Sequence, residues 1–394
     1  MAVRPGRRCS MPSTKLKNIL YRSALPFCSP SPGRNPLLPE TGHRVNDLHG
    51  LSRIIRRHHV LGGAFLISDG KDCSIVFERP FSSVPSPDAD SYFRVASITK
   101  MATALLSLLL VHDGLLDPDA PIARYLPESD GIQEIEGVSL RHLLSHTSGI
   151  SDPPGLEKKL ESGLPYRDAV SGARFSEPGT AFRYSNLGFG LVGCMMEYIT
   201  GIALGSLFAS RIFIPLGMNA SIEGCALPEN RIMPVVRVLP YHPEKAVTVT
   251  PLGRSPLTVP DPLRHYGHTA GSMYTDIRSL YRLLLCIRDN GAPLVPACGT
   301  SVMKEIHAAY GNLSPSLSYG LGLLIINDSR LSPNPVMGHQ GFAYGCADGA
   351  FWEENTGRVM IILNSGCSEA REGRLGLCNR DMLRWTFQKE LSSW

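Results

Sequence analysis

Hydrophobic and polar residues alternate along the chain with two different periods, and each period predicts a kind of element. Residues 44–59 (RVNDLHGLSRIIRRHH) place their apolar side chains at helical spacing, which predicts an amphipathic helix. Residues 61–80 (LGGAFLISDGKDCSIVFERP) predict two strands joined at Asp69-Gly70, a dipeptide that favours hairpin turns. From Phe93, a short predicted strand leads into a long apolar helix, in the sequence FRVASITKMATALLSLLLVHDGLL.

Strand patterns return near the end of the chain, after a middle part that mixes predicted helices with loops rich in Pro and Gly. A helix is predicted near 278–289. Residues 319–328 (YGLGLLIIND), 336–354 (VMGHQGFAYGCADGAFWEE) and 357–366 (GRVMIILNSG) predict three neighbouring strands, and 379–391 predict a closing amphipathic helix. Strands at both ends favour an α+β fold, in which both chain ends build one antiparallel sheet flanked by helices.

The pattern divides the chain into a tail and one domain of two lobes. Residues 43–390 form the predicted domain, with an α/β lobe at 43–115 and 281–394 and an inserted, mainly helical lobe at 116–280. Residues 1–42 are rich in Arg, Pro and Ser and contain one acid, which predicts a disordered basic tail; a transit peptide is the alternative.

Charge and cysteine content narrow the function classes. The tail carries +6 of a net charge of +4, so the rest of the chain carries about −2 and shows no footprint for nucleic acid. The ten cysteines form no Cys-x-x-Cys pair and several lie in apolar sequence, which predicts reduced, buried thiols. No apolar run reaches about 18 residues, so no membrane span is predicted. Together these features favour a cytoplasmic protein.

A serine followed three residues later by a lysine occurs three times, as Ser68…Lys71, Ser97…Lys100 and Ser301…Lys304. Only Ser97 and Lys100 lie where a predicted strand turns into a long apolar helix, so that both side chains project from one helix face. The N–H of Ser97 would then be a free helix-terminal donor, available to an oxyanion. The alternative is a surface lysine one turn after a helix-starting serine.

A lysine activates a serine only when its pKa falls far below about 10.4, through burial or nearby cations. The apolar residues after Lys100 favour burial. Tyr184 and Asn186, in the sequence YSN before an amphipathic helix, are spaced to point into one cleft, where Tyr relays a proton and Asn holds a carbonyl or the lysine amine. The alternative is a packing Tyr beside a helix cap.

A third motif, His339-Gln340-Gly341, lies in a predicted strand. On an edge strand, Gly341 would let a substrate approach the backbone, and the N–H of Phe342 would be a second oxyanion donor. Similar pairs elsewhere fit this pattern less well: His265…Gly267 in a Gly-rich loop and Tyr310…Asn312 close to Lys304. We predict structural roles in a loop, rather than a metal site, for His142, His146 and Asp152. We also predict that Glu353 and Glu354 are solvated residues at a turn.

In this order, Ser97-x-x-Lys100, Tyr184-x-Asn186 and His339-x-Gly341 resemble the serine-reactive penicillin-recognising superfamily of class C β-lactamases, D,D-peptidases, D-aminopeptidases and β-lactamase-like esterases. The likeness covers about 43–390 and is carried by the segments 93–128, 138–150, 175–201, 267–285 and 337–366. It implies a serine hydrolase that forms an acyl-enzyme on a small-molecule or peptide substrate, with no metal or organic cofactor.

The chain departs from the class C pattern at its third motif, where such enzymes commonly have Lys-Thr-Gly. A histidine near Lys100 is expected to be mostly neutral, which weakens the demand for a substrate carboxylate. An esterase, amidase or peptidase is therefore favoured over a true β-lactamase. A transesterase and a non-catalytic penicillin-binding-like module are further alternatives. Relatives often work outside the cytoplasm, which is the alternative location, and the sequence carries no signal for an oligomeric state.

Overall fold

A computed structural model describes residues 37–39, 48–78, 84–238, 248–250, 254, 256–295, 300–311, 314–343 and 345–388. The predicted tail of residues 1–42 therefore lies, apart from 37–39, outside the described residues.

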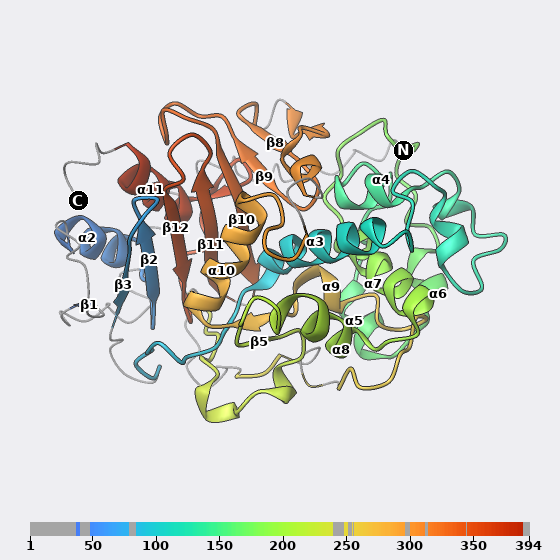
Figure 1. The fold of residues 1–394 in the computed structure, drawn as a ribbon, viewed down its shortest axis with the longest axis horizontal. Coiled ribbons are helices and arrows are strands. Elements are labelled where there is room, and N and C mark those ends of the chain that lie inside the picture. The colour runs from blue at the N-terminus through green and yellow to red at the C-terminus, as the bar shows by residue number, and fades with distance from the viewer. Residues whose placement is uncertain are drawn as a thin grey trace, which may run out of the picture.

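A nine-stranded antiparallel sheet forms one side of the molecule (Figure 1). Its strands, in spatial order, are β1 (Leu38–Pro39), β3 (Cys73–Phe77), β2 (Ala64–Ser68), β12 (Val359–Leu363), β11 (Cys346–Glu353), β10 (Val336–Ala343), β9 (Leu324–Ile326), β8 (Leu317–Tyr319) and β7 (Ala308–Ala309). The two ends of the chain meet where β2 pairs with β12. The predicted α+β fold with a sheet built from both ends is confirmed.

Two of the strand predictions were wrong in detail. Residues 336–354 form two strands, β10 and β11, paired from Val336 opposite Glu353 to Ala343 opposite Cys346. Residues 319–328 are divided between β8 and β9. The break contains Gly322, where φ is +69° and a Cβ would lie 2.8 Å from the carbonyl oxygen of Lys100. Close packing on the helix that begins at Thr99 therefore interrupts a sequence that reads as one strand.

Helices cover both faces of the sheet. On one face α2 (Leu48–His58) packs beside α11 (Leu377–Phe387), and on the other lies α10 (Ile277–Arg288). Successive residues of β2 confirm the two faces, because Phe65 belongs to the core under α2 and α11 whereas Leu66 belongs to the core with α10. Since α10 packs on β2, β11 and β12, the predicted lobe boundary at 280/281 falls inside a helix of the sheet region.

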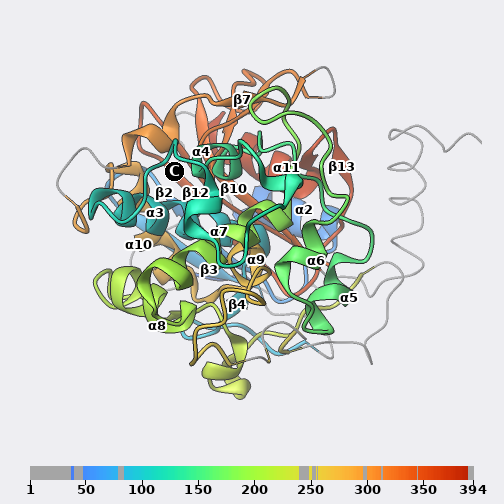
Figure 2. The ribbon, with the colours of Figure 1, turned by 90° about the vertical axis from the view of Figure 1, so that its right-hand side faces the viewer.

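The segment between the sheet's two contributions is mainly helical and lies beside the sheet, facing the viewer in Figure 2. It contains α4 (Leu140–Leu144), α5 (Leu156–Glu161), α6 (Tyr166–Val170), α7 (Asn186–Thr200), α8 (Leu204–Phe208), a π-helical turn (Ala209–Phe213) and α9 (His268–Gly271). Short 3-10 helices occupy Ile122–Tyr125, Gln133–Ile135, Gly224–Ala226, Glu229–Arg231 and Ser301–Lys304. The helix α3 (Thr99–His112) runs between this segment and the sheet (Figure 1).

Two small sheets complete the described chain. One joins β4 (Phe93–Arg94), β6 (Tyr274–Thr275) and β5 (Ala220–Ser221), and the other is the hairpin of β13 (Arg371–Glu372) and β14 (Leu375–Gly376). Twelve of the fourteen residues of α3 are buried, so this helix lies inside the core. It therefore offers a rigid, water-excluded base for any group at its first turn.

Membrane and cysteine findings concern the described residues alone. No single helix among them is long and apolar enough to cross a membrane; Asn186–Thr200 and Leu204–Phe213 reach that length and apolarity together but are bent by 86°. Five of the described cysteines are buried and form no disulfide: Cys194, Cys286, Cys346, Cys367 and Cys378. This agrees with the prediction of reduced thiols that pack in the core.

Candidate active site

Ser97 lies at the junction that the sequence predicts, between the short strand β4 and the helix α3. It is the middle residue of a 3-10 turn, Ala96–Ile98, which leads directly into α3. Ala96 has φ of +47°, a left-handed conformation that costs energy in a residue with a Cβ. The hydroxyl of Thr99 holds the turn by donating to the carbonyl of Ala96 at 2.6 Å and accepting from the N–H of Met273 at 3.1 Å. Ser97 is thus fixed at the start of a buried helix.

The strand β10 lies directly beside this turn. The predicted edge strand was wrong, because β10 lies between β9 and β11. However, β9 pairs only with Val336–Gly338, and the later part of β10 contacts the Ala96–Ile98 turn instead. A Cβ on Gly341 would lie 2.3 Å from the carbonyl oxygen of Val95. Gly341 therefore makes room for the serine turn, a reason different from the substrate approach that the sequence suggested.

Lys100 is completely buried, and its ammonium nitrogen reaches three oxygen atoms. Nζ lies 2.6 Å from the carbonyl oxygen of Ala270, 2.8 Å from Oδ1 of Asn186 and 3.3 Å from Oγ of Ser97. The first two contacts come from α9 and the start of α7, elements far apart in the sequence. The structure thus brings together Ser97, Lys100 and Asn186.

Burial lowers the pKa of Lys100 to about 7. The negative charge of Asp152 raises this pKa and the positive charge of Arg94 lowers it, but both effects are smaller than that of burial. At neutral pH a substantial fraction of Lys100 is therefore an uncharged amine, as the apolar helix sequence predicted.

Tyr184 packs against the same lysine. Nζ of Lys100 lies 4.8 Å from the centre of the Tyr184 ring and 5.4 Å from that of Phe189. Burial raises the pKa of Tyr184 well above its usual value, although a hydrogen bond with Ser97 acts in the opposite direction. The phenol therefore stays protonated at neutral pH and is available as a proton donor next to the serine.

Two residues outside the predicted site hold the Tyr184–Asn186 segment. His146 lies under Tyr184, with ring centres 4.2 Å apart, and its Nδ1 accepts the N–H of Ser185 at 3.1 Å. Asp152 accepts hydrogen bonds from Asn186 and from the neighbouring backbone. The sequence assigned both residues to loop-structural roles. Among the described residues, no group of three or more His, Cys, Asp or Glu side chains has the geometry to hold a metal ion.

His339 is engaged on both ring nitrogens. Nε2 lies 2.8 Å from the hydroxyl of Tyr319, and Nδ1 lies 2.6 Å from the carbonyl oxygen of Gln340. A carbonyl only accepts, so Nδ1 carries the proton and Nε2 accepts from Tyr319. Burial, and next the charge of Lys100, lower the pKa of His339 to about 3. The expected neutral histidine is therefore present, and burial contributes more than the neighbouring cation.

Gln340 and Phe342 hold the hairpin β13–β14 against β10. The side-chain amide of Gln340 donates to the carbonyl of Arg374 at 2.6 Å and accepts from the N–H of Gly376 at 3.1 Å. The guanidinium of Arg371 lies 4.0 Å from the centre of the Phe342 ring. Two arginines that no sequence motif pointed to are thereby placed near Ser97.

The other candidate residues lie in different surroundings. Ser68 accepts from the N–H of Gly70 within the β2–β3 turn. Lys304 pairs with Glu354 at 3.1 Å. The expectation that Glu353 is solvated was wrong, because its carboxylate is buried and paired with Arg358 at 2.7 Å. His265 pairs with Glu197 at 2.8 Å, away from the serine.

Comparison with known proteins identifies the family of this chain. The family model described as Beta-lactamase matches residues 51–364, a range that contains every residue of the predicted site. The chain belongs to the beta-lactamase family.

Individual relatives of this beta-lactamase family member carry several activities in their names. Esterase EstB of Burkholderia gladioli is 27% identical over 338 residues, which cover 74% of this chain and 82% of that protein. Penicillin-binding protein 4* of Bacillus subtilis is 29% identical over 186 residues, 44% of this chain and 40% of that protein. The D-amino acid amidase of Ochrobactrum anthropi shares the fold, with a TM-score of 0.67, 24% identity and coverage of 85% and 95%.

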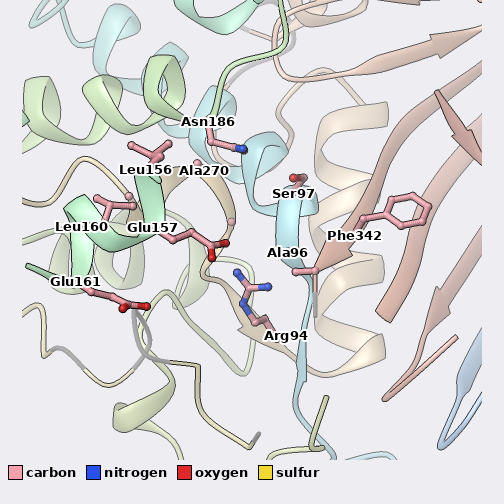
Figure 3. A pocket seen from close by; sticks show the side chains of 13 residues that line it. Arg94, Ala96, Ser97, Leu156, Glu157, Leu160, Glu161, Asn186, Ala270 and Phe342 are labelled. Atoms are coloured by element: carbon pink, nitrogen blue, oxygen red, sulfur yellow. The ribbon is translucent and has the colours of Figure 1, made fainter. Parts of the chain in front are cut away.

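In this beta-lactamase family chain, Ser97 borders two cavities. The helical-side cavity, of about 150 Å³, is also lined by Arg94, Leu156, Glu157, Leu160 and Glu161. Figure 3 shows the guanidinium of Arg94 and the carboxylate of Glu157 pointing toward each other in it, while the Phe342 ring points away. The sheet-side cavity, of about 240 Å³, is also lined by Tyr184, Tyr310, His339, Arg371 and Arg374. Asn186 and Phe342 line both, so the two cavities share one border around Ser97.

Proposed function

We propose that this protein is a serine hydrolase that cleaves an ester, amide or peptide bond through an acyl-enzyme at Ser97. The observation that carries the proposal is the environment of Lys100: a completely buried amine 3.3 Å from the serine hydroxyl, with a pKa lowered to about 7. Family membership and relatives named as an esterase and a penicillin-binding protein support the same class.

The contacts of Lys100 favour proton transfer from Ser97 in particular. A neutral amine has two N–H groups and one lone pair. Carbonyl oxygens of Asn186 and Ala270 lie within 2.8 Å of Nζ, and these oxygens only accept hydrogen bonds. Both N–H groups are thus occupied, which leaves the lone pair for the hydroxyl of Ser97. The amine is therefore oriented as a general base before a substrate arrives.

In the acylation step, Oγ of Ser97 forms a bond to the substrate carbonyl carbon while its proton passes to Nζ of Lys100. The N–H groups of Ser97 and Phe342 are the proposed donors to the resulting oxyanion. The tetrahedral intermediate then breaks its bond to the leaving oxygen or nitrogen, which takes a proton through Tyr184 and Lys100. Tyr184 suits this role because its phenol is half-buried and its raised pKa keeps it protonated.

In the deacylation step, a water molecule attacks the acyl carbon and gives its proton to the same pair, Lys100 and Tyr184. The bond to Oγ of Ser97 breaks, the carboxylic acid leaves and the serine regains its proton. Asn186 is proposed to hold both the lysine and the substrate, since its side chain contacts Nζ and lines both cavities.

Substrate preference follows from the sheet-side cavity. His339 replaces the lysine of β-lactamases and is neutral, which lowers the demand for a carboxylate. Arg371 and Arg374 line the same cavity and supply positive charge from a different element. We therefore propose esters, amides and peptides as the substrate class, and a test series should contain each substrate with and without a carboxylate near the scissile bond.

The experiment uses a fluorophosphonate that reacts with activated serines. Wild-type protein and Ser301→Ala are expected to be labelled, whereas Ser97→Ala is not, because Ser97 lies beside the buried amine of Lys100, whose pKa is lowered to about 7. Mass spectrometry should locate the label on Ser97. The same variants are then assayed on short acyl esters, D-amino-acid amides and a cephalosporin reporter. Labelling that persists in Ser97→Ala, or hydrolysis of the cephalosporin alone, would contradict the proposal.

A further inference from the structure

Asp152 lies behind Asn186, on the side away from Lys100. Its carboxylate accepts three hydrogen bonds, each 2.9 Å long: Oδ1 from the hydroxyl of Ser185 and the N–H of Leu187, and Oδ2 from Nδ2 of Asn186. Two of these donors belong to the first turn of α7, where a negative charge is favourable. The residue is therefore tied to the helix start by geometry that leaves it little freedom.

The segment that carries Asp152 is itself anchored. The N–H of Ser151 donates to the carbonyl of Ala173 at 2.9 Å. Gly149 has φ of +74°, and a Cβ there would lie 2.0 Å from the carbonyl oxygen of Ser176. Only glycine fits this close approach, so the chain is held in place three residues before the carboxylate.

These contacts decide which way the amide of Asn186 points. A carboxylate only accepts hydrogen bonds, so the Nδ2 group of Asn186 must face Asp152. Oδ1 of Asn186 must then face Lys100, whose Nζ lies 2.8 Å away. If the amide were reversed, an N–H would point at Nζ and the lysine lone pair would turn toward Asn186 instead of Ser97.

We propose that Asp152 is a positioning residue that fixes the amide of Asn186, so that Lys100 presents its lone pair to Ser97. This inference rests on the proposed hydrolase function and adds a residue that lines neither of the two cavities at Ser97. Asp152 also bears on the charge of the base, because its carboxylate raises the pKa of Lys100 against the effect of burial.

Several other ionisable groups surround Lys100, and their titration could contribute to the pH dependence of activity. They are Arg94 from β4, Tyr184 beside α7, His146 from the loop after α4 and His339 from β10. Burial lowers the pKa values of both histidines and raises that of Tyr184, so these three stay uncharged near pH 7. Lys100 is therefore the group among them that titrates on the acid side of the activity profile.

The test compares the pH dependence of kcat/KM in wild type, Asp152→Asn and Ser185→Ala. In Asp152→Asn the new amide presents an N–H to Asn186, so the Asn186 amide reverses and kcat falls by about tenfold to a hundredfold. The loss of charge also lowers the pKa of Lys100, so the acid limb moves to lower pH by about one unit, the smallest shift typical of a neighbouring charge. Ser185→Ala removes one contact of the carboxylate but keeps the charge, and its limb should stay at the wild-type pH.

A double variant, Asp152→Asn with Asn186→Asp, sharpens the test. It keeps the total charge but moves the carboxylate next to Lys100, so the acid limb should lie at higher pH than in the wild type. An Asp152→Asn limb at the wild-type position, or an equal shift in Ser185→Ala, would overturn the inference and leave Asp152 a purely structural residue.

A measurement that needs no turnover distinguishes failure of the hydrolase proposal from failure of the inference about Asp152. The pKa of Lys100 can be followed through the ¹³C shift of its ε-carbon in lysine-labelled protein, with assignment from Lys100→Arg. A pKa lower in Asp152→Asn than in the wild type supports the inference even if Ser97 reacts with no probe. An unchanged pKa overturns it even if Ser97 is the nucleophile.

Discussion

Ser97…Lys100 and Ser301…Lys304 have the same spacing in the sequence and opposite surroundings in the structure. Lys100 is completely buried and contacts two carbonyl oxygens and a serine. Lys304 lies in a 3-10 turn, where it forms an ion pair with Glu354 and donates to the carbonyl of Arg288. The second lysine is partly exposed and faces a carboxylate, whereas burial lowers the pKa of the first to about 7. The chemistry therefore depends on the acceptors around the lysine rather than on the motif.

The largest expected effect is on the two lysines themselves. Lys100→Met should lower kcat/KM by about 10²- to 10⁴-fold, the range that a positioned general base contributes. Lys304→Met removes one partly exposed ion pair, so activity should stay near that of wild type and stability should change by about 1 kcal/mol or less. Steady-state kinetics and thermal unfolding of both variants check this contrast. Equal losses of activity in the two variants would contradict the different roles of Lys100 and Lys304.

A second prediction concerns pH. Because Lys100 acts in its neutral form, kcat/KM should rise with pH and reach half its maximum near pH 7, the value to which burial lowers the pKa of this lysine. A profile measured from pH 3 to 9 on one ester substrate tests it. An acid limb near pH 4 to 5 would point to a carboxylate base instead.

The smallest of the three effects is expected at Gly341. Gly341→Ala forces a Cβ against the carbonyl of Val95, so the serine turn must move away from β10. We expect a loss of about 1–3 kcal/mol in unfolding free energy, as for other overpacked sites, together with lower activity. Gly188→Ala, where a Cβ meets only ordinary contacts of 3.5 Å or more, is the matched control and should cost less on both measures.

The sequence pointed to the reacting groups better than to the groups that hold them. Ser97 and Lys100 are close in sequence, and a helix start brings them together, so their spacing and their place at a predicted strand-to-helix junction made them candidates. His146 lies in the segment 138–150 and Asp152 just after it, and the sequence assigned both to loop-structural roles. Only the folded chain shows that both form hydrogen bonds with residues 185 and 186. Arg371 gave no signal, because its place depends on a hairpin held by Gln340.

The fold shows the same division. The strand periods indicated β2, β3 and β12 correctly, since these strands are buried over most of their length. The break between β8 and β9 follows from the contact of Gly322 with α3, which no local pattern records. Local periodicity therefore predicts elements, whereas contacts between distant segments decide where they stop.

The hairpin β13–β14 has a consequence for how specificity can change. It lies in the sequence between Cys367 and Cys378, which are both buried. The side chain of Gln340 forms two hydrogen bonds with its backbone. Those hydrogen bonds involve only main-chain atoms of the hairpin, so they do not depend on the side chains that the hairpin places at the sheet-side cavity. The side chains of this hairpin can therefore be substituted, by evolution or by an engineer, while Ser97, Lys100 and the residues that hold them stay unchanged.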